Sequence, residues 1–184
     1  QAIADLRGWA PLVALQIEYS LIERTGERDL IPMAREMGLG VVPYSPLGGG
    51  LLTGKYSRAD LTGAGPAPDG SSRRDHNAAL GMLTERNLGI ADAVREVALE
   101  TGHTSAQVGL AWTLRNPAVT ASVIGARTLD QLADNLGALD VDLTEAHLAR
   151  LEEAGAIEPG IPHALLAGDP MRRATRGELT IQLR

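Results

Sequence analysis

The chain of 184 residues contains no cysteine and no phenylalanine, and aromatic residues make up only 3% of it. The absence of cysteine excludes disulfides, thiolate metal ligands and a cysteine nucleophile, and it fits a reducing cytoplasm. No apolar run approaches the roughly 18 residues of a membrane-spanning helix, and the N-terminus carries no signal-peptide pattern. With so few aromatic side chains, the core must be built from Ala, Leu, Val and Ile.

The remaining composition is that of a globular protein, with 44% hydrophobic and 22% charged residues. The net charge of −6 argues against non-specific attraction to nucleic acid or to anionic membranes. The length suits one domain with a real core. It falls below the roughly 200 residues at which the smallest (β/α)₈ barrels begin.

Hydrophobic patterning predicts an α/β chain. Short apolar runs ending in polar or turn residues predict three strands, over residues 12–19, 39–44 and 119–124. Helical spacing and the capping residues Asp29, Thr104, Thr128 and Thr144 predict helices over 30–37, 87–100, 105–114, 129–139 and 145–154. The first strand–helix–strand unit predicts a parallel sheet. Three strands cannot close a barrel, so we expect the C-terminal portion of something larger.

Residues 45–86 are long and irregular in this interpretation, and Gly63–Ser72 is the part richest in Gly, Pro and Ser. A loop of this length inside a compact domain is typical of a functional lid or a mobile segment.

The segment Gly49–Tyr56 resembles a phosphate-binding P-loop, but Tyr56 stands where a Ser or Thr hydroxyl would bind Mg²⁺. That substitution argues against an ATPase. Consecutive glycines after a strand can still let backbone N–H groups approach an anion closely. The alternative is that these glycines form a flexible hinge.

The segment Gly125–Thr128 follows the third predicted strand and precedes a helix. Thr128 as N-cap leaves a positive helix end facing the loop, and Arg127 beside it would favour a phosphate. Alternatively, this is a capped helix with a solvated arginine. Because two predicted strands end in phosphate-compatible loops, and the C-terminal ends of strands carry the site in α/β folds, we favour phosphate binding.

No catalytic or metal-binding cluster emerges from the residues. His76, His103, His147 and His163 are scattered without metal-site spacing. No Ser-His-Asp arrangement can be argued. The residues alone therefore predict a phosphate-binding α/β piece without visible catalytic groups.

Three ordered motifs resemble the aldo-keto reductase family, above all its bacterial branch related to the potassium-channel β subunits. They are QIEYS at 16–20, VPYSPLGGGLLTGKY at 42–56 and VIGARTLDQLADN at 123–135. Residues 154–166 are also similar to a C-terminal tail of that branch. The resemblance covers 1–167 as a partial barrel and leaves 168–184, with Arg172, Arg173 and Arg176, as a tail of unknown role.

The resemblance implies strands six to eight of a (β/α)₈ TIM barrel that binds NADP(H) and reduces aldehydes or ketones by hydride transfer. It implies that Gln16 binds the nicotinamide carboxamide and Tyr44 stacks on its ring. It places the pyrophosphate and 2′-phosphate contacts at Ser45, Leu47, Gly49, Lys55, Gly125, Ala126, Arg127 and Gln131, with Asn135 reaching the adenine.

The family's catalytic Asp, Tyr, Lys and His lie on the first half of the barrel, and none can be placed in this chain. Tyr19 belongs to the cofactor-side motif and is not assigned as the proton donor. We therefore expect the cofactor-binding part of a cytoplasmic enzyme with a small carbonyl substrate, no nucleic-acid or membrane partner, and possible self-association. The alternatives are a non-catalytic nucleotide-binding or interaction module, or an inactive fragment.

Overall fold

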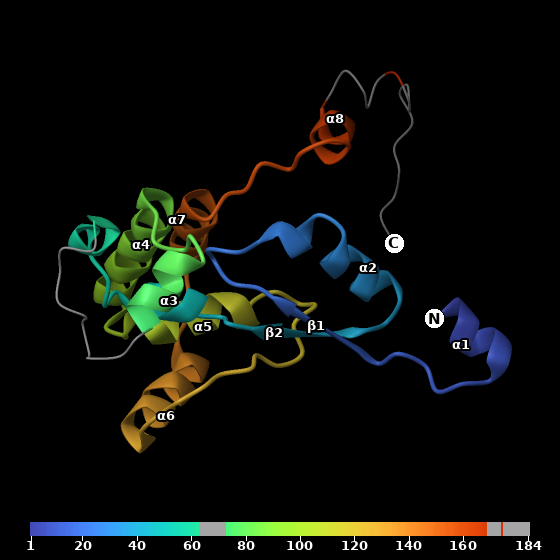
Figure 1. Cartoon of the computed structure of the whole chain (residues 1–184), viewed down its shortest axis with the longest axis horizontal. Coiled ribbons are helices and arrows are strands. Elements are labelled where there is room, and N and C mark those ends of the chain that lie inside the picture. Colours follow the sequence, from blue (N-terminus) through green and yellow to red (C-terminus); the bar gives the residue numbers. More distant parts are fainter. Residues whose placement is uncertain (63–72, 169–173, 175–184) are drawn as a thin grey trace.

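The structure, a computed structural model, describes residues 1–62, 73–168 and 174. The glycine- and proline-rich segment 63–72 and nearly all of the tail after 168, including Arg172, Arg173 and Arg176, lie outside the described residues. The described part has an α/β fold, in which helices pack against one face of a small parallel sheet (Figure 1).

The sheet consists of β1 (Ala14–Glu18) and β2 (Gly40–Tyr44), which run parallel with Gln16 opposite Val42. Helix α2 (Leu30–Glu36) connects the strands and buries Ile31 and Ala34 in the core beside β2. Leu15 and Ile17 of β1 pack against the same cluster. The predicted parallel strand–helix–strand unit is therefore confirmed.

The predicted third strand is wrong in its extent, because residues 119–124 form only one isolated bridge, between Val41 and Val119. This segment still runs alongside β2: Thr120 N–H donates to the Val41 carbonyl (2.9 Å) and Val123 N–H to that of Pro43 (2.7 Å). A regular ladder would require a donor at position 43, and proline has no N–H. Pairing consequently ends after one bridge.

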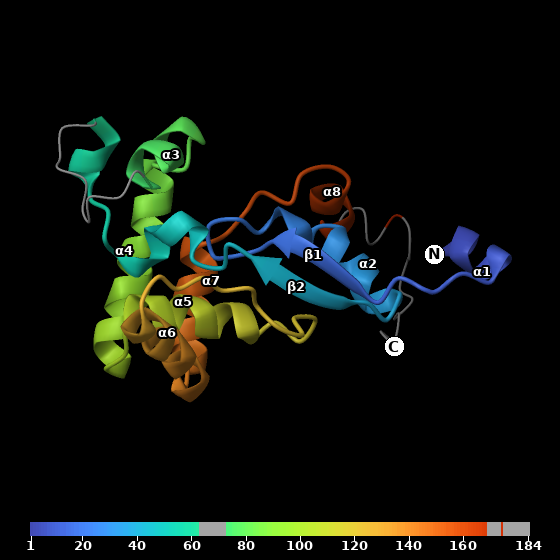
Figure 2. The same cartoon turned by 60° about the horizontal axis from the view of Figure 1, so that its bottom comes forward.

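Three helices, α4 (Glu85–Thr101), α5 (Ser105–Leu114) and α7 (Glu145–Ala154), form a bundle beside the sheet (Figures 1 and 2). The core between bundle and sheet is largely aliphatic, as the composition predicts. Its two aromatic members are Tyr19 and Trp112, whose ring centroids lie 5.4 Å apart. The bundle and the buried face of the sheet therefore share one continuous core.

Threonine caps begin four of the helices. Thr104 and Thr144 form reciprocal capping boxes on α5 and α7. Thr128 caps α6 (Leu129–Leu136), which ends earlier than predicted and continues as the 3₁₀ turn η4 (Gly137–Asp140). Asp29 stands at the N-cap position of α2, as predicted, but its side chain forms no capping hydrogen bond, and its carboxylate pairs with His163 Nε2 at 3.1 Å.

The stretch expected to be irregular, 45–86, contains short helices in its described part, so that expectation is only partly correct. They are the 3₁₀ helices η2 (Gly48–Thr53) and η3 (Arg58–Thr62), and α3 (Arg73–Ala79). A further 3₁₀ turn, η1 (Thr25–Glu27), precedes α2. Helices α1 (Ala2–Arg7) and α8 (His163–Ala167) extend away from the body (Figure 1).

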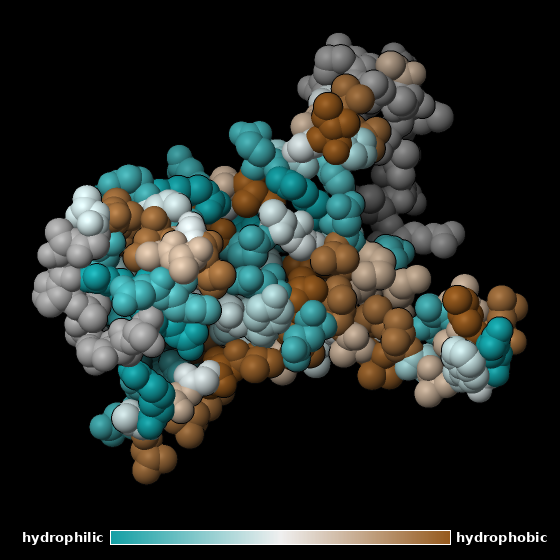
Figure 3. Space-filling model, in the orientation of Figure 1, coloured by the Kyte–Doolittle hydropathy of each residue, from teal (hydrophilic) through white to brown (hydrophobic). Residues whose placement is uncertain are grey.

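Large apolar side chains remain exposed on the outlying elements, and brown surface extends along them in Figure 3. Leu6 is 86% exposed on α1, and Leu129 is 83% exposed at the start of α6. Across the sheet, Gln16 and Tyr44 lie on the face away from the core and are exposed. Within the described ranges, no helix is long and apolar enough to cross a membrane.

Candidate functional site

A cavity of about 1060 Å³ lies where three segments meet: the glycine-rich chain after β2, helix α3, and the chain from Val123 into α6. The N-terminal end of α5 closes a fourth side. The lining residues are Ser45, Pro46, Leu47, Gly49, Gly50, Thr53, Lys55, Arg73, His76, Thr104, Ser105, Ala106, Val123, Ile124, Gly125, Ala126, Arg127, Gln131, Asp134 and Asn135.

The glycine-rich wall has an unusual backbone. Gly48, Gly49 and Gly50 have φ values of 54°, 63° and 90°, in the left-handed region that glycine adopts without steric penalty, and Ser45 also has a positive φ of 50°. At Gly50, an added Cβ would lie 3.1 Å from Cε of Lys55, so the absent side chain leaves room for the lysine to cross the backbone. Main chain and ammonium group therefore converge on the cavity.

The opposite wall is the beginning of α6. Gln131 Oε1 accepts a hydrogen bond from the Arg127 backbone N–H at 2.9 Å, which fixes the loop before the helix. This differs from a full capping box, in which the same oxygen would bind the Thr128 N–H. Asn135, one turn further, is buried yet lines the cavity, and its side chain forms no hydrogen bond with the described residues.

Positive charge dominates the lining. Among the described residues that line the cavity, Lys55, Arg73 and Arg127 are cationic and Asp134 is acidic. Asp134 Oδ1 already accepts hydrogen bonds from Thr104 Oγ1 and Gln107 Nε2, both at 3.1 Å. The described lining thus holds three cationic side chains and one acidic side chain, a composition that suits an anion with several charges.

The structure brings most of the predicted site residues together around this one cavity. They are Ser45, Leu47, Gly49, Lys55, Gly125, Ala126, Arg127, Gln131 and Asn135. It does not bring Gln16 and Tyr44 to the cavity wall, because both side chains point from the open face of the sheet.

Sequence analysis missed two further parts of the wall. Arg73 and His76 come from α3, in a stretch that was expected to be irregular. Thr104 and Ser105 come from the start of α5, whose capping box was recognised without placing it near a site. The sequence signal available for this wall was the predicted N-terminus of α5, because a helix N-terminus favours a phosphate group.

Tyr19 lies away from this cavity in a buried network. Its hydroxyl donates to Glu27 Oε1 at 2.8 Å and accepts from Asn116 Nδ2 at 3.0 Å. Burial is the main reason that the pKa of the phenol is raised well above its ordinary value. Arg24 joins Glu27 to Glu152 and lies 5.1 Å above the Trp112 ring. These contacts tie the loop after β1 to α5 and α7.

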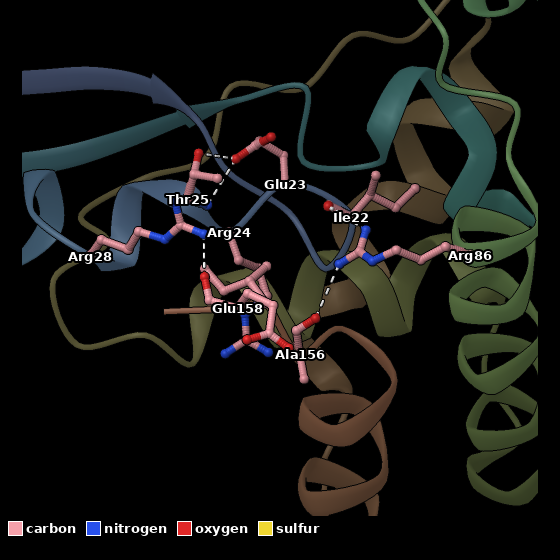
Figure 4. Close-up of a pocket in the computed structure, with 9 residues that line it drawn as sticks. Ile22, Glu23, Arg24, Thr25, Arg28, Arg86, Ala156 and Glu158 are labelled. Carbon is pink, nitrogen blue, oxygen red and sulfur yellow. Dashed lines mark hydrogen bonds between the residues drawn. The ribbon is translucent and has the colours of Figure 1, made fainter. Parts of the chain in front are cut away.

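A second, smaller cavity of about 490 Å³ lies between the loop after β1 and the chain after α7 (Figure 4). Arg86 donates to the Ala156 carbonyl at 3.3 Å, and Arg28 donates to that of Glu158. Its arginines therefore hold the C-terminal segment in place. No group of three or more His, Asp or Glu side chains suited to a metal ion occurs in the described part of the chain.

Comparison of the sequence with known proteins identifies its family. The model of the Aldo/keto reductase family matches residues 1–156. Uncharacterized oxidoreductase YrpG of Bacillus subtilis (strain 168) is 38% identical over 153 residues, 83% of this chain and 43% of that protein. Probable aldo-keto reductase 1 of Glycine max is 35% identical, covering 78% and 40%.

A third relative is L-glyceraldehyde 3-phosphate reductase of Escherichia coli (strain K12), which is 34% identical over 80% of this chain and 43% of its own length. The chain thus spans less than half the length of these relatives. Because the family model covers most of the residues, the chain belongs to the aldo/keto reductase family.

Proposed function

We propose that this chain is the NADP(H)-binding part of an aldo-keto reductase that reduces aldehydes or ketones. The observation that supports the proposal is the single cavity that gathers the glycine-rich backbone, Lys55, Arg127 and Asn135 from segments far apart in the sequence. In the whole protein, β1, β2 and residues 119–124 would be strands six to eight of a (β/α)₈ barrel. A cytoplasmic location and the branch related to potassium-channel β subunits belong to the same proposal.

The residues present fit a dinucleotide with a 2′-phosphate. Its pyrophosphate would lie against the glycine-rich segment and Lys55, where the left-handed backbone leaves no side chain in the way. Its 2′-phosphate would lie against Arg127 and Gln131. Its adenine would give a hydrogen-bonding group to the buried amide of Asn135, which has no hydrogen-bond partner among the described residues.

The chain's own role is to hold and orient the cofactor. When bound, NADPH supplies the hydride for carbonyl reduction. Gln16 and Tyr44, on the open sheet face, would contact the nicotinamide end. The catalytic Asp, Tyr, Lys and His are expected on the half of the barrel that precedes these strands, and the substrate is a small carbonyl compound.

The test is titration of NADPH and NADH against wild type, Arg127→Ala and Arg35→Ala at one fixed salt concentration. Charge-assisted hydrogen bonds contribute about 1.5–3 kcal/mol each. Arg127→Ala should therefore weaken NADPH binding roughly 10- to 150-fold. NADH binding should change little because NADH lacks the 2′-phosphate. Arg35, an exposed arginine of α2 that does not line the cavity, controls for lost positive charge.

Two outcomes would contradict the assignment. Equal losses of affinity for NADPH and NADH would mean that Arg127 does not bind the 2′-phosphate. Failure of the wild-type chain to bind NADPH would refute the proposed function as a whole.

A further inference from the structure

Asn77 of α3 is the most completely buried polar side chain next to the cavity, at 1% exposure. Its Nδ2 donates to the Gly49 carbonyl at 3.1 Å and lies 3.3 Å from the Tyr56 hydroxyl. These contacts bridge 28 and 21 residues of sequence. One side chain therefore joins α3 to the glycine-rich wall.

The space around Gly49 is shaped by this amide. Gly49 has φ 63°, and a Cβ added there would lie 2.6 Å from Asn77 Oδ1. That oxygen is buried and has no hydrogen-bond partner among the described residues. Burying an unpaired acceptor is unfavourable, but the amide is held in place by the two contacts of its Nδ2.

The position of Asn77 on its helix matters as well. Arg73 lies four residues earlier, on the same face of α3, and His76 is adjacent; both line the cavity. The hydrogen bond to Gly49 therefore fixes two walls relative to each other, the glycine-rich segment and α3.

We propose that Asn77 is a positioning residue of the nucleotide site: it holds the glycine-rich segment and α3 in the relative arrangement that binds the cofactor. This inference rests on the proposed function. Asn77 does not line the cavity, so its effect on binding is transmitted through Gly49 and through Arg73. Its local holding role is measurable without any cofactor.

The experiment compares Asn77→Ala with Asn87→Ala in the same chain. Asn87 is also a buried asparagine whose Nδ2 donates to a backbone carbonyl, that of Met82 at 2.8 Å, but it does not touch the cavity. Amide hydrogen exchange of residues 45–56 is followed without ligand, and NADPH affinity is measured by titration.

We expect Asn77→Ala to speed exchange in 45–56 at least about tenfold and to weaken NADPH binding roughly tenfold, equivalent to about 1.4 kcal/mol. Asn87→Ala should do neither. If Asn77→Ala does not fold, Asn77→Asp keeps the side-chain volume while removing the amide donor, and the same two changes are expected.

Unchanged exchange in 45–56 would overturn the holding role. Faster exchange with unchanged NADPH affinity would overturn the positioning role. If wild type binds no NADPH, the proposed function fails and the positioning role falls with it, while the exchange data still decide whether Asn77 holds the segment.

Discussion

Replacing Gly49 with alanine should be far more damaging than the same change at Gly81. Both glycines have positive φ, 63° and 67°, so alanine at either position carries the left-handed penalty of about 1–2 kcal/mol. Only Gly49 has a neighbour in the way: its new Cβ would lie 2.6 Å from the buried Asn77 Oδ1, whereas nothing lies within 4 Å at Gly81. Forcing an extra methyl group into packed surroundings costs about 1–3 kcal/mol more.

We therefore expect Gly49→Ala to lose about 2–5 kcal/mol of the free energy of unfolding in urea, and Gly81→Ala about 1–2 kcal/mol. Gly49→Ala should also weaken NADPH binding, while Gly81→Ala should not. Adding Asn77→Ala removes the obstructing amide, so the extra loss at Gly49 should shrink in the double variant. Equal losses at the two glycines, or an extra loss that persists without Asn77, would refute this account of the glycine-rich wall.

Burial, and then the nearby charge of Glu23, raise the pKa of Glu18 in the folded protein. Protonated Glu18 therefore stabilises the fold below the unfolded-state pKa, and this contribution is lost as the pH rises through the folded-state pKa. Glu18→Gln should therefore be more stable than wild type in urea at pH 7 and lose that advantage in acid; a pH-independent difference would contradict this. Trp112→Phe should lose about 1–2 kcal/mol of unfolding free energy, because Trp112 Nε1 donates to Glu152 Oε1 at 2.9 Å; unchanged urea unfolding would count against it. The 184 residues alone should not turn over an aldehyde with NADPH at ordinary reductase rates, since we expect the proton donor elsewhere. The open sheet edge should cause oligomers in light scattering, and a monodisperse monomer with a sharp melt would speak against that.

Local patterns were sufficient to predict most helices and the two paired strands. The capping boxes at Thr104 and Thr144 depend on residues only three apart, so they are visible in the sequence. Asp29 also stands at a helix N-cap position, but its side chain forms no capping hydrogen bond, and its carboxylate pairs with His163, which is far away along the chain. The extent of the third strand was not predicted for a related reason. Its pairing depends on Pro43 of the neighbouring strand, which has no backbone N–H to donate.

The candidate site divides in the same way. Arg127 and Gln131 are close in sequence, and their contact follows from the helix start that the sequence predicts. The α3 wall could not be predicted, because Asn77 reaches Gly49 across 28 residues that gave no periodic signal. Tertiary contacts of single polar side chains leave no local pattern.

Gln16 and Tyr44 show where the cavity stops. The described cavity covers the positions assigned to the phosphates and the adenine, whereas these two residues, assigned to the nicotinamide, lie on an open sheet face. In a parallel barrel, the inward face of each strand is covered by side chains from the other strands. In the proposed barrel, the phosphate end would need only loops from these strands and helices, which this chain supplies. The nicotinamide end would need neighbours across the barrel, and we infer that it would become a pocket only when further strands cover that face.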